Sequence, residues 1–339
     1  MSTVAPTLWG RIGDGLEIRW SPSCSTWRVP VCRTQARWPL QRVTNGLRLL
    51  ALSSVVTAAG CGSSPVSPSP LSPSSPPTVV AAAPGRVAII SIDGLRPDAI
   101  LTVGAPNILA LAARGAYSWR AQTILPSTTL PSHVSMLSGF TPDVHRMDWD
   151  DYTTERGPIP VPTIFSVAQG QGRRTAMIAG KHKFTYFCDM GACDVWAISG
   201  NGDDDLSARA VSERDVDLLF VHLPDVDLTG HASGWMSEPY LAAVRRADLA
   251  VGRIISSLPH DTTVILSADH GGHLTQHGSS HALDVTIPWI VAGPRVARGR
   301  ELSSSIRTVD TAATAAYVLG VPLQPTAAGR PVLEAFASQ

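Results

Sequence analysis

Acids and histidines follow three short apolar runs of the chain, at the point where each run ends. The residues at these three ends are Asp93; Asp225, Asp227 and His231; and Asp269 and His270. Carboxylates and neutral imidazoles together are the ligands that zinc and similar divalent ions take in proteins. The set is too large for one four-coordinate ion, so we expect two divalent metal ions, with Zn²⁺ the favoured element. Two ions about 4 Å apart hold the attacking and the leaving oxygen of a phosphoryl group in line.

A second polar group lies between the first of these runs and the others, in the sequence Thr128-Thr129-Leu130-Pro131-Ser132-His133. The residues that follow predict a helix, and the start of a helix favours negative charge through its free N–H groups and its macrodipole. Ordinary helix capping is the alternative explanation for these hydroxyls. Because a metal ion converts a threonine hydroxyl into an effective nucleophile, we interpret the segment as a nucleophile with an oxyanion pocket.

The elements that must position these groups are strands alternating with helices. This pattern is typical of an α/β domain with a mostly parallel central sheet flanked by helices. We expect strands within residues 87–94, 174–180, 215–225, 262–272 and 286–294, and helices within 105–116, 238–258 and 310–320. Ligands of such sheets bind beyond the carboxyl ends of the strands. The acids and histidines should therefore meet at one edge of the sheet.

The composition suits a single compact folded domain. Of 339 residues, 44% are hydrophobic and 16% are charged, which is typical of a buried core rather than of disorder. The 27 basic and 27 acidic residues cancel, so neither binding to a nucleic-acid duplex nor a polybasic membrane patch is expected. The oligomeric state stays open.

The first 84 residues have a different character. Residues 1–42 hold four of the nine tryptophans without any clear periodicity, and we expect a non-native or unstructured leader, with Val43 as the true start. Residues 43–60 have the layout of a secretory signal and precede Cys61, which resembles a bacterial lipoprotein signal. A short buried helix is the alternative. Residues 61–84 are rich in proline and serine, as in an extended tether, and lead into a catalytic domain at 85–339.

These features predict export to the cell envelope or periplasm, where the protein would contact the membrane only through a lipidated Cys61. In an oxidising compartment Cys188 and Cys193, the two cysteines of the folded part, would close a small loop. Two free buried thiols are the alternative.

Four segments, in order, resemble the alkaline phosphatase superfamily and in particular its type I phosphodiesterase/nucleotide pyrophosphatase family. They read SIDGLRPD, TLPSHVSMLSGFTPDVH, DVDLTGH and SADHGG, and the resemblance runs from Val87 to Phe336. It implies a phosphoester hydrolase in which Thr129 attacks phosphorus and a covalent phospho-threonine forms. It also implies two metal sites, one formed by Asp93, Thr129, Asp269 and His270 and the other by Asp227, His231 and a later histidine.

Two ligand choices follow from the motifs of the family. Asp227 is preferred to Asp225 because it stands in the family's Asp-x-x-Gly-His pattern. His277 is chosen as the last ligand because it precedes a glycine, with His281 as the reserve and His273 the least favoured.

The expected substrate is a small phosphoester, and three residues are candidates for binding it. Ser132 stands where nucleotide pyrophosphatases usually have asparagine, three residues after the nucleophile, and would contact a phosphoryl oxygen. Lys181 and Lys183 resemble a Lys-x-Arg pair of some phosphomonoesterases, and solvated loop lysines are the alternative. The motifs as a whole favour a phosphodiesterase of the nucleotide pyrophosphatase type, with a phosphomonoesterase as the alternative.

Other classes fit less well. Sulfatases of this fold use an oxidised cysteine or serine as nucleophile and an arginine where His133 stands. Phosphoglycerate-mutase-like enzymes are cytosolic, which conflicts with the expected signal, and lipid-head-group transferases carry membrane helices that the sequence does not suggest. A non-catalytic binding module should have lost some ligands, whereas this chain keeps a candidate for each.

Overall fold

The computed structural model describes residues 85–336. The expected leader, signal sequence, lipidated Cys61 and tether lie outside the described residues, so these assignments stay predictions. Between residues 85 and 336, no helix is both long enough and apolar enough to cross a bilayer.

An eight-stranded sheet forms the centre of the fold, in the order β4-β3-β5-β1-β6-β7-β2-β8. Five of its pairings are parallel, and β7 runs antiparallel to both of its neighbours, β6 and β2. The strands are β1 (Arg86–Ile92), β2 (Ala116–Gln122), β3 (Thr175–Ala179), β4 (Val195–Ile198), β5 (Leu218–Leu223), β6 (Thr262–Ser267), β7 (Thr286–Ala292) and β8 (Arg300–Glu301). The mostly parallel α/β sheet predicted from the sequence is confirmed.

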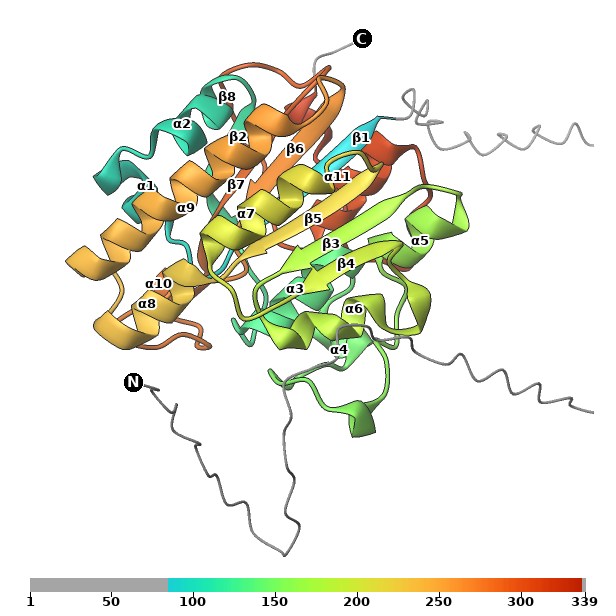
Figure 1. The fold of residues 1–339 in the computed structure, drawn as a ribbon, viewed down its shortest axis with the longest axis horizontal. Coiled ribbons are helices and arrows are strands. Elements are labelled where there is room, and N and C mark those ends of the chain that lie inside the picture. Colours follow the sequence, from blue (N-terminus) through green and yellow to red (C-terminus); the bar gives the residue numbers. More distant parts are fainter. Residues whose placement is uncertain (1–84, 337–339) are drawn as a thin grey trace, which may run out of the picture. The chain divides into compact units, whose positions relative to one another are not determined.

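Helices cover both faces of this sheet, as Figure 1 shows, with α7 and α9 across one face and α3, α5 and α11 behind it. Their bounds are α1 (Pro97–Val103), α2 (Pro106–Ala113), α3 (Thr129–Ser138), α4 (Pro142–His145), α5 (Ile164–Gly170), α6 (Thr185–Cys188), α7 (Asp203–Ser212), α8 (Asp225–Ser233), α9 (Glu238–Ser257), α10 (Ala282–Val285) and α11 (Asp310–Leu319). Because both faces are covered, every residue of β3, β5 and β6 is buried.

The five predicted strands are all present, and so are the four predicted helices, one of which is α3 at the Thr128–His133 segment. The strand expected over residues 215–225 is shorter, because β5 ends at Leu223 and Asp225 begins α8. The helix expected over 238–258 is α9, whose start is capped by the Ser237 hydroxyl accepting the backbone N–H of Tyr240. Strands β2, β4 and β8 were not predicted.

The register of the three central strands aligns their carboxyl ends. Ile92 of β1 pairs with Leu223 of β5, and Ser91 pairs with Ser267 of β6. The residues that leave these three strands therefore enter the same space, as expected for ligands of a parallel sheet.

Candidate metal centre and nucleophile

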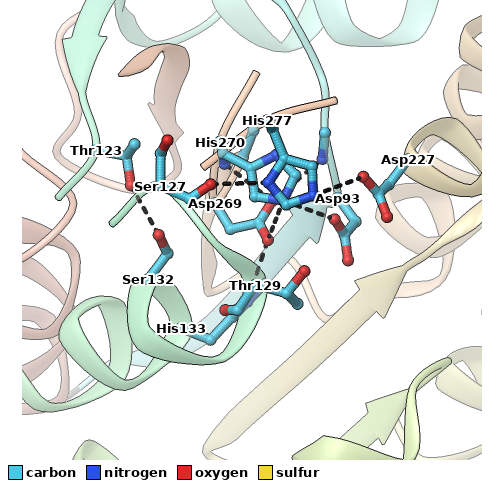
Figure 2. A network of polar contacts seen from close by, with 12 residues as sticks. Asp93, Thr123, Ser127, Thr129, Ser132, His133, Asp227, Asp269, His270 and His277 are labelled. Atoms are coloured by element: carbon cyan, nitrogen blue, oxygen red, sulfur yellow. Dashed lines mark hydrogen bonds and ion pairs between the residues drawn. The ribbon is translucent and has the colours of Figure 1, made fainter. Parts of the chain in front are cut away.

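Asp93, Asp269 and His270 form the first group of candidate ligands at this edge. One ligand atom from each lies within 4.8 Å of the others, and all three residues are fully buried. The His270 Nε2 atom is 3.3 Å from Asp93 Oδ1 and 3.3 Å from Asp269 Oδ2. Thr129, the first residue of α3, lies beside this group in Figure 2 and is 1% exposed. The four ligands that the sequence predicted for one metal are thus brought together.

Asp227, His231 and His277 form the second group. Helix α8 places Asp227 and His231 on one face because they are four residues apart. The His231 Nε2 and His277 Nε2 atoms are 3.5 and 3.7 Å from Asp227 Oδ1 and 3.1 Å from each other. Asp225 instead contacts Asp203, and His281 and His273 belong to a different group. The structure therefore groups the residues preferred from the sequence.

Hydrogen bonds fix the ring orientation of all three histidines in these groups. In each, Nδ1 lies within hydrogen-bond distance of a backbone carbonyl: His270 with Gly271 O (2.7 Å), His231 with Thr275 O (3.0 Å) and His277 with Ser127 O (2.8 Å). A carbonyl oxygen only accepts, so Nδ1 carries the proton and donates it. In the neutral ring, the form that binds a metal ion, the lone pair of Nε2 then faces the carboxylates, which is the arrangement of a metal-binding histidine.

Four buried polar atoms of these groups have no hydrogen-bond partner. They are Asp93 Oδ1, Asp227 Oδ1, Asp269 Oδ2 and His270 Nε2. Buried polar atoms are normally paired, and a missing ion is one of the standard explanations when they are not. The donor set and the orphaned atoms therefore fit divalent metal ions.

The pKa values in the first group show how strongly its charges interact. Burial and the negative charge of Asp93 raise the pKa of Asp269 above its ordinary value. Burial would lower the pKa of His270, but the carboxylates of Asp269 and Asp93 outweigh it and raise that pKa to about 10. Burial would likewise raise the pKa of Asp93, yet the positive charge of Lys181 and the hydrogen bond from His222 hold it well below its ordinary value. The carboxylates of this first group therefore stabilise a positive charge placed among them.

Lys181 connects the two groups. Its Nζ is 2.7 Å from Asp93 Oδ2, 2.6 Å from Asp227 Oδ2 and 3.4 Å from Thr129 Oγ1. Burial opposes the charge on this lysine, but the two carboxylates outweigh it and raise its pKa above the ordinary value. The predicted site residue Lys181 is therefore beside the candidate nucleophile.

Lys183 has a different environment. Its Nζ pairs with Asp150 Oδ2 at 2.6 Å, and Asp150 Oδ1 accepts the backbone N–H of Leu130 at 2.6 Å. Lys183 therefore acts on the start of α3 only through Asp150, which the sequence analysis did not single out. The Asp150 carboxylate accepts the backbone N–H of Leu130, which an anionic ligand at the start of α3 would otherwise use.

The Ser132 hydroxyl has a partner inside the protein. All residues of α3 are buried, and the Ser132 hydroxyl is 3.1 Å from Thr123 Oγ1. Figure 2 shows the side chain directed toward Thr123 rather than toward the Thr129 hydroxyl. Residues three apart on a helix lie on the same side of it, but here the packing of α3 gives the Ser132 hydroxyl a partner inside the protein. This arrangement gives no support to the predicted contact with a phosphoryl oxygen.

His222 is a residue of the site that the sequence analysis missed, because it lies inside the apolar run of β5. Its Nδ1 accepts the backbone N–H of Gly180 (3.3 Å), so Nε2 carries the proton and donates to Asp93 Oδ2 at 2.7 Å. A histidine within a strand that is otherwise apolar was the available signal. His222 orients Asp93 toward the group.

The segment after the lysines is closed by a disulfide between Cys188 and Cys193. The pairing expected for an oxidising compartment is present, and the alternative of two free thiols is not what the structure shows. The bridge closes the short loop that follows Lys181 and Lys183.

Comparison with known proteins agrees with the motifs. The sequence model of the type I phosphodiesterase/nucleotide pyrophosphatase family matches residues 87–285. Among curated proteins, human GPI ethanolamine phosphate transferase 1 is 25% identical over 255 residues, which are 65% of this chain and 27% of the transferase. A phosphopentomutase of Desulfitobacterium hafniense is 30% identical over 172 residues, which are 50% of this chain and 42% of the mutase. The chain thus spans about a quarter of the length of the transferase.

Solved structures share the fold. Murine ectonucleotide pyrophosphatase/phosphodiesterase 5, as an inactive variant in complex with AMP, has a TM-score of 0.65 at 13% identity and covers 75% of this chain and 100% of its own. A 2-O GAG sulfatase has a TM-score of 0.60 at 17% identity and covers 75% of this chain and 74% of its own. At such identities the likeness concerns the fold, which is that of the alkaline phosphatase superfamily.

Proposed function

This chain belongs to the type I phosphodiesterase/nucleotide pyrophosphatase family, and from that premise we propose that it hydrolyses small phosphoesters with Thr129 as the nucleophile and two divalent ions, Zn²⁺ foremost, as cofactors. The observation that carries the proposal is the pair of ligand groups beside a buried threonine hydroxyl at the start of α3. No nucleic-acid duplex is needed as a partner.

The residues that would hold the ions are the two groups described above. Asp93, Thr129, Asp269 and His270 would bind one ion, and Asp227, His231 and His277 the other. When bound, the ions supply positive charge that favours the ionised hydroxyl of Thr129 and neutralises the phosphoryl oxygens. The four orphaned buried atoms and the three histidines with Nε2 directed at carboxylates support this assignment.

The reaction steps fall to residues of the chain. The Thr129 hydroxyl gives its proton to solvent, Oγ1 attacks phosphorus opposite the leaving oxygen, and the bond to that oxygen breaks, so that the leaving group departs as an alcohol after taking a proton from water and a phospho-threonine remains. Lys181, 3.4 Å from Thr129 Oγ1, donates to a phosphoryl oxygen as negative charge develops there. Water then attacks the phosphorus of the phospho-threonine and releases the phosphate product and the free hydroxyl.

The electrostatics of the helix start favour a diester over a monoester. A monoester dianion carries one more negative charge than a diester, and it needs additional cationic donors. Lys183 is engaged by Asp150, and the Asp150 carboxylate itself stands at the Leu130 N–H. Of the two lysines only Lys181, which also pairs with Asp93 and Asp227, lies within 3.4 Å of Thr129 Oγ1 and so near the phosphoryl group. We therefore favour the diesterase, with a phosphomonoesterase as the second candidate.

Water as the acceptor is part of the proposal, because relatives with a similar sequence are named as transferases and mutases. A non-catalytic surface module is the remaining alternative, and it predicts protein without bound zinc and without turnover. Metal analysis of purified protein distinguishes the metal-dependent hydrolase from the non-catalytic module.

A paired assay tests the proposal. Wild-type protein and the variant Lys181→Ala are assayed with bis-p-nitrophenyl phosphate and with p-nitrophenyl phosphate in ¹⁸O-labelled water. We expect faster turnover of the diester and one labelled oxygen in the product. Preference for the monoester that disappears in Lys181→Ala would replace the diesterase by a phosphomonoesterase. Turnover that appears only when an alcohol acceptor is added would replace the hydrolase by a transferase.

Export and anchoring are proposed separately. We propose that the mature protein begins at a lipidated Cys61 and remains in the cell envelope. Cys61→Ser should move the protein from the membrane fraction to the soluble fraction. Peptides from residues 3–37 in the precursor would contradict the start at Val43.

A further inference from the structure

We propose that His273, His281 and Asp284 form a third divalent-metal site, separate from the two catalytic groups. One ligand atom from each of these residues lies within 4.8 Å of the others. Two imidazoles and one carboxylate are a donor set of zinc and similar ions. Three protein ligands also leave one position of a tetrahedral ion for water. The proposal does not depend on the catalytic mechanism.

Asp284 is held in one orientation. Its side chain is fully buried, and its Oδ2 accepts the backbone N–H of Ser279 at 3.1 Å and the Ser279 hydroxyl at 2.7 Å. Its Oδ1 is 2.6 Å from His273 Nδ1. Oδ2 is thus held by Ser279, and Oδ1 is paired with His273, which is the contact that a bound ion would replace.

His273 is also fixed, whereas His281 faces the solvent. The backbone N–H and carbonyl of His273 both pair with Gln276, at 2.9 and 3.0 Å. The His273 ring is 20% exposed and stacks on the exposed His281 ring, with centroids 4.3 Å apart. The Nδ1 of His281 accepts the N–H of Leu283 at 3.2 Å. An ion would reach the group from the side of the exposed His281 ring. Binding at the Nδ1 of His281 would replace one contact, the hydrogen bond from the Leu283 N–H.

The third site would act on the loop that supplies His277. This loop runs from His273 to Asp284, and its Ser279 carbonyl accepts the Ser127 hydroxyl at 2.8 Å. His277 itself belongs to the second ligand group, with Asp227 and His231. An ion held by residues at both ends of the loop cross-links it, so the His277 ring is presented to the catalytic centre in a fixed position.

The experiment counts zinc ions in the full chain. Chelator-treated protein is titrated with Zn²⁺ alone, and bound ions are counted by native mass spectrometry. We expect three ions on the wild type, and we expect two on His281→Ala and on His273→Ala at concentrations that saturate the wild type. His260→Ala removes an exposed histidine outside all three groups and should keep three. Loss of His281 should raise the dissociation constant of the third ion at least about tenfold, equivalent to 1.4 kcal/mol.

A second variant separates this site from the catalytic pair. Asp93→Asn combined with Asp227→Asn should abolish the catalytic ions and still bind one zinc ion. Saturation of the wild type at two ions would overturn the proposal, and so would three ions on both histidine variants. If the double aspartate variant binds no zinc although it is folded by circular dichroism, the third site does not exist as an independent one.

Discussion

Lys181 and Lys183 are two residues apart, and they serve different parts of the site. Lys181 contacts a carboxylate of each ligand group and approaches Thr129, whereas Lys183 contacts Asp150. From the sequence alone the two lysines were equivalent candidates for binding the substrate, because they are the same amino acid in the same short segment. Only the course of the backbone after β3, which enters the short turn His182–Phe184, directs the two side chains to different partners.

The proposed nucleophile, Thr129, is tested by removing its hydroxyl. We expect Thr129→Ala to lower kcat by about 10⁴-fold, because the hydroxyl that would form the covalent intermediate is removed. The metal content should stay near that of the wild type, since the remaining ligands are intact. Thr129→Ser should recover part of the activity. Both are measured by single-turnover kinetics with bis-p-nitrophenyl phosphate and by metal analysis. Unchanged turnover in Thr129→Ala would show that the assignment is wrong.

Asp150 is expected to exclude monoester dianions. Its removal frees the Leu130 N–H and Lys183, both of which then face a third phosphoryl oxygen. Asp150→Ala should raise kcat/KM for p-nitrophenyl phosphate relative to the diester by about tenfold, which corresponds to 1.4 kcal/mol. The double variant Asp150→Ala/Lys183→Ala should lose much of that gain. An unaltered substrate ratio in Asp150→Ala would mean that this carboxylate is only structural.

At the scale of elements, α7 and α8 cap each other. The backbone N–H of Asp203 donates to Asp225 Oδ2 at 3.3 Å, and the N–H of Asp225 donates to Asp203 Oδ1 at 3.2 Å. Each acid is the first residue of its helix. Because α8 carries Asp227 and His231, this reciprocal contact sets the start of the helix that supplies the second ligand group.

This contact should make stability depend on pH. Burial and the charge of Asp225 raise the pKa of Asp203 to about 7, above the ordinary 3.8. The folded state therefore holds a proton that the unfolded state releases, so the stabilisation is complete below about pH 4 and is lost as the pH rises through 7. Asp203→Asn should be more stable than the wild type at pH 8, by about 2–4 kcal/mol.

Urea unfolding of metal-loaded protein at pH 5 and pH 8 measures the effect. Asp205→Asn, an exposed acid on the same helix, is the matched control and should follow the wild type at both values. A constant difference between Asp203→Asn and the wild type would mean that Asp203 does not titrate in this range.

A strand or a site residue could be predicted from the sequence only where the residues next to it in the chain indicate it clearly. Continuous apolar runs such as β1, β5 and β6 are readily recognised, because a strand buried on both faces contains almost nothing else. Strand β2 alternates buried and partly exposed residues and contains an exposed arginine, Arg120, so its signal is weak. The ligand groups were predictable as strand-end residues, whereas His222 and Asp150 were not, because their roles depend on contacts with residues distant in the chain.

At the scale of the whole molecule, bound metal should contribute strongly to stability. Three buried carboxylates lie close together in the ligand groups, and several of their atoms lack partners. An ion present at about 1,000 times its dissociation constant adds about 4 kcal/mol to the free energy of unfolding, so chelation should lower Tm by about 10 °C. Differential scanning calorimetry with and without a chelator measures this, and re-addition of Zn²⁺ is the control. Identical Tm values would contradict metal binding by these groups.

The orphaned buried atoms have a consequence for the cell that makes the protein. A chain whose ligand groups are empty retains uncompensated polar atoms in its interior, so it opens more often and is cut by proteases in proportion to the population of the open state. The amount of protein should then follow the supply of metal in the medium, even at a constant rate of synthesis. Growth without zinc would lower the amount of the protein in the cell as well as its activity.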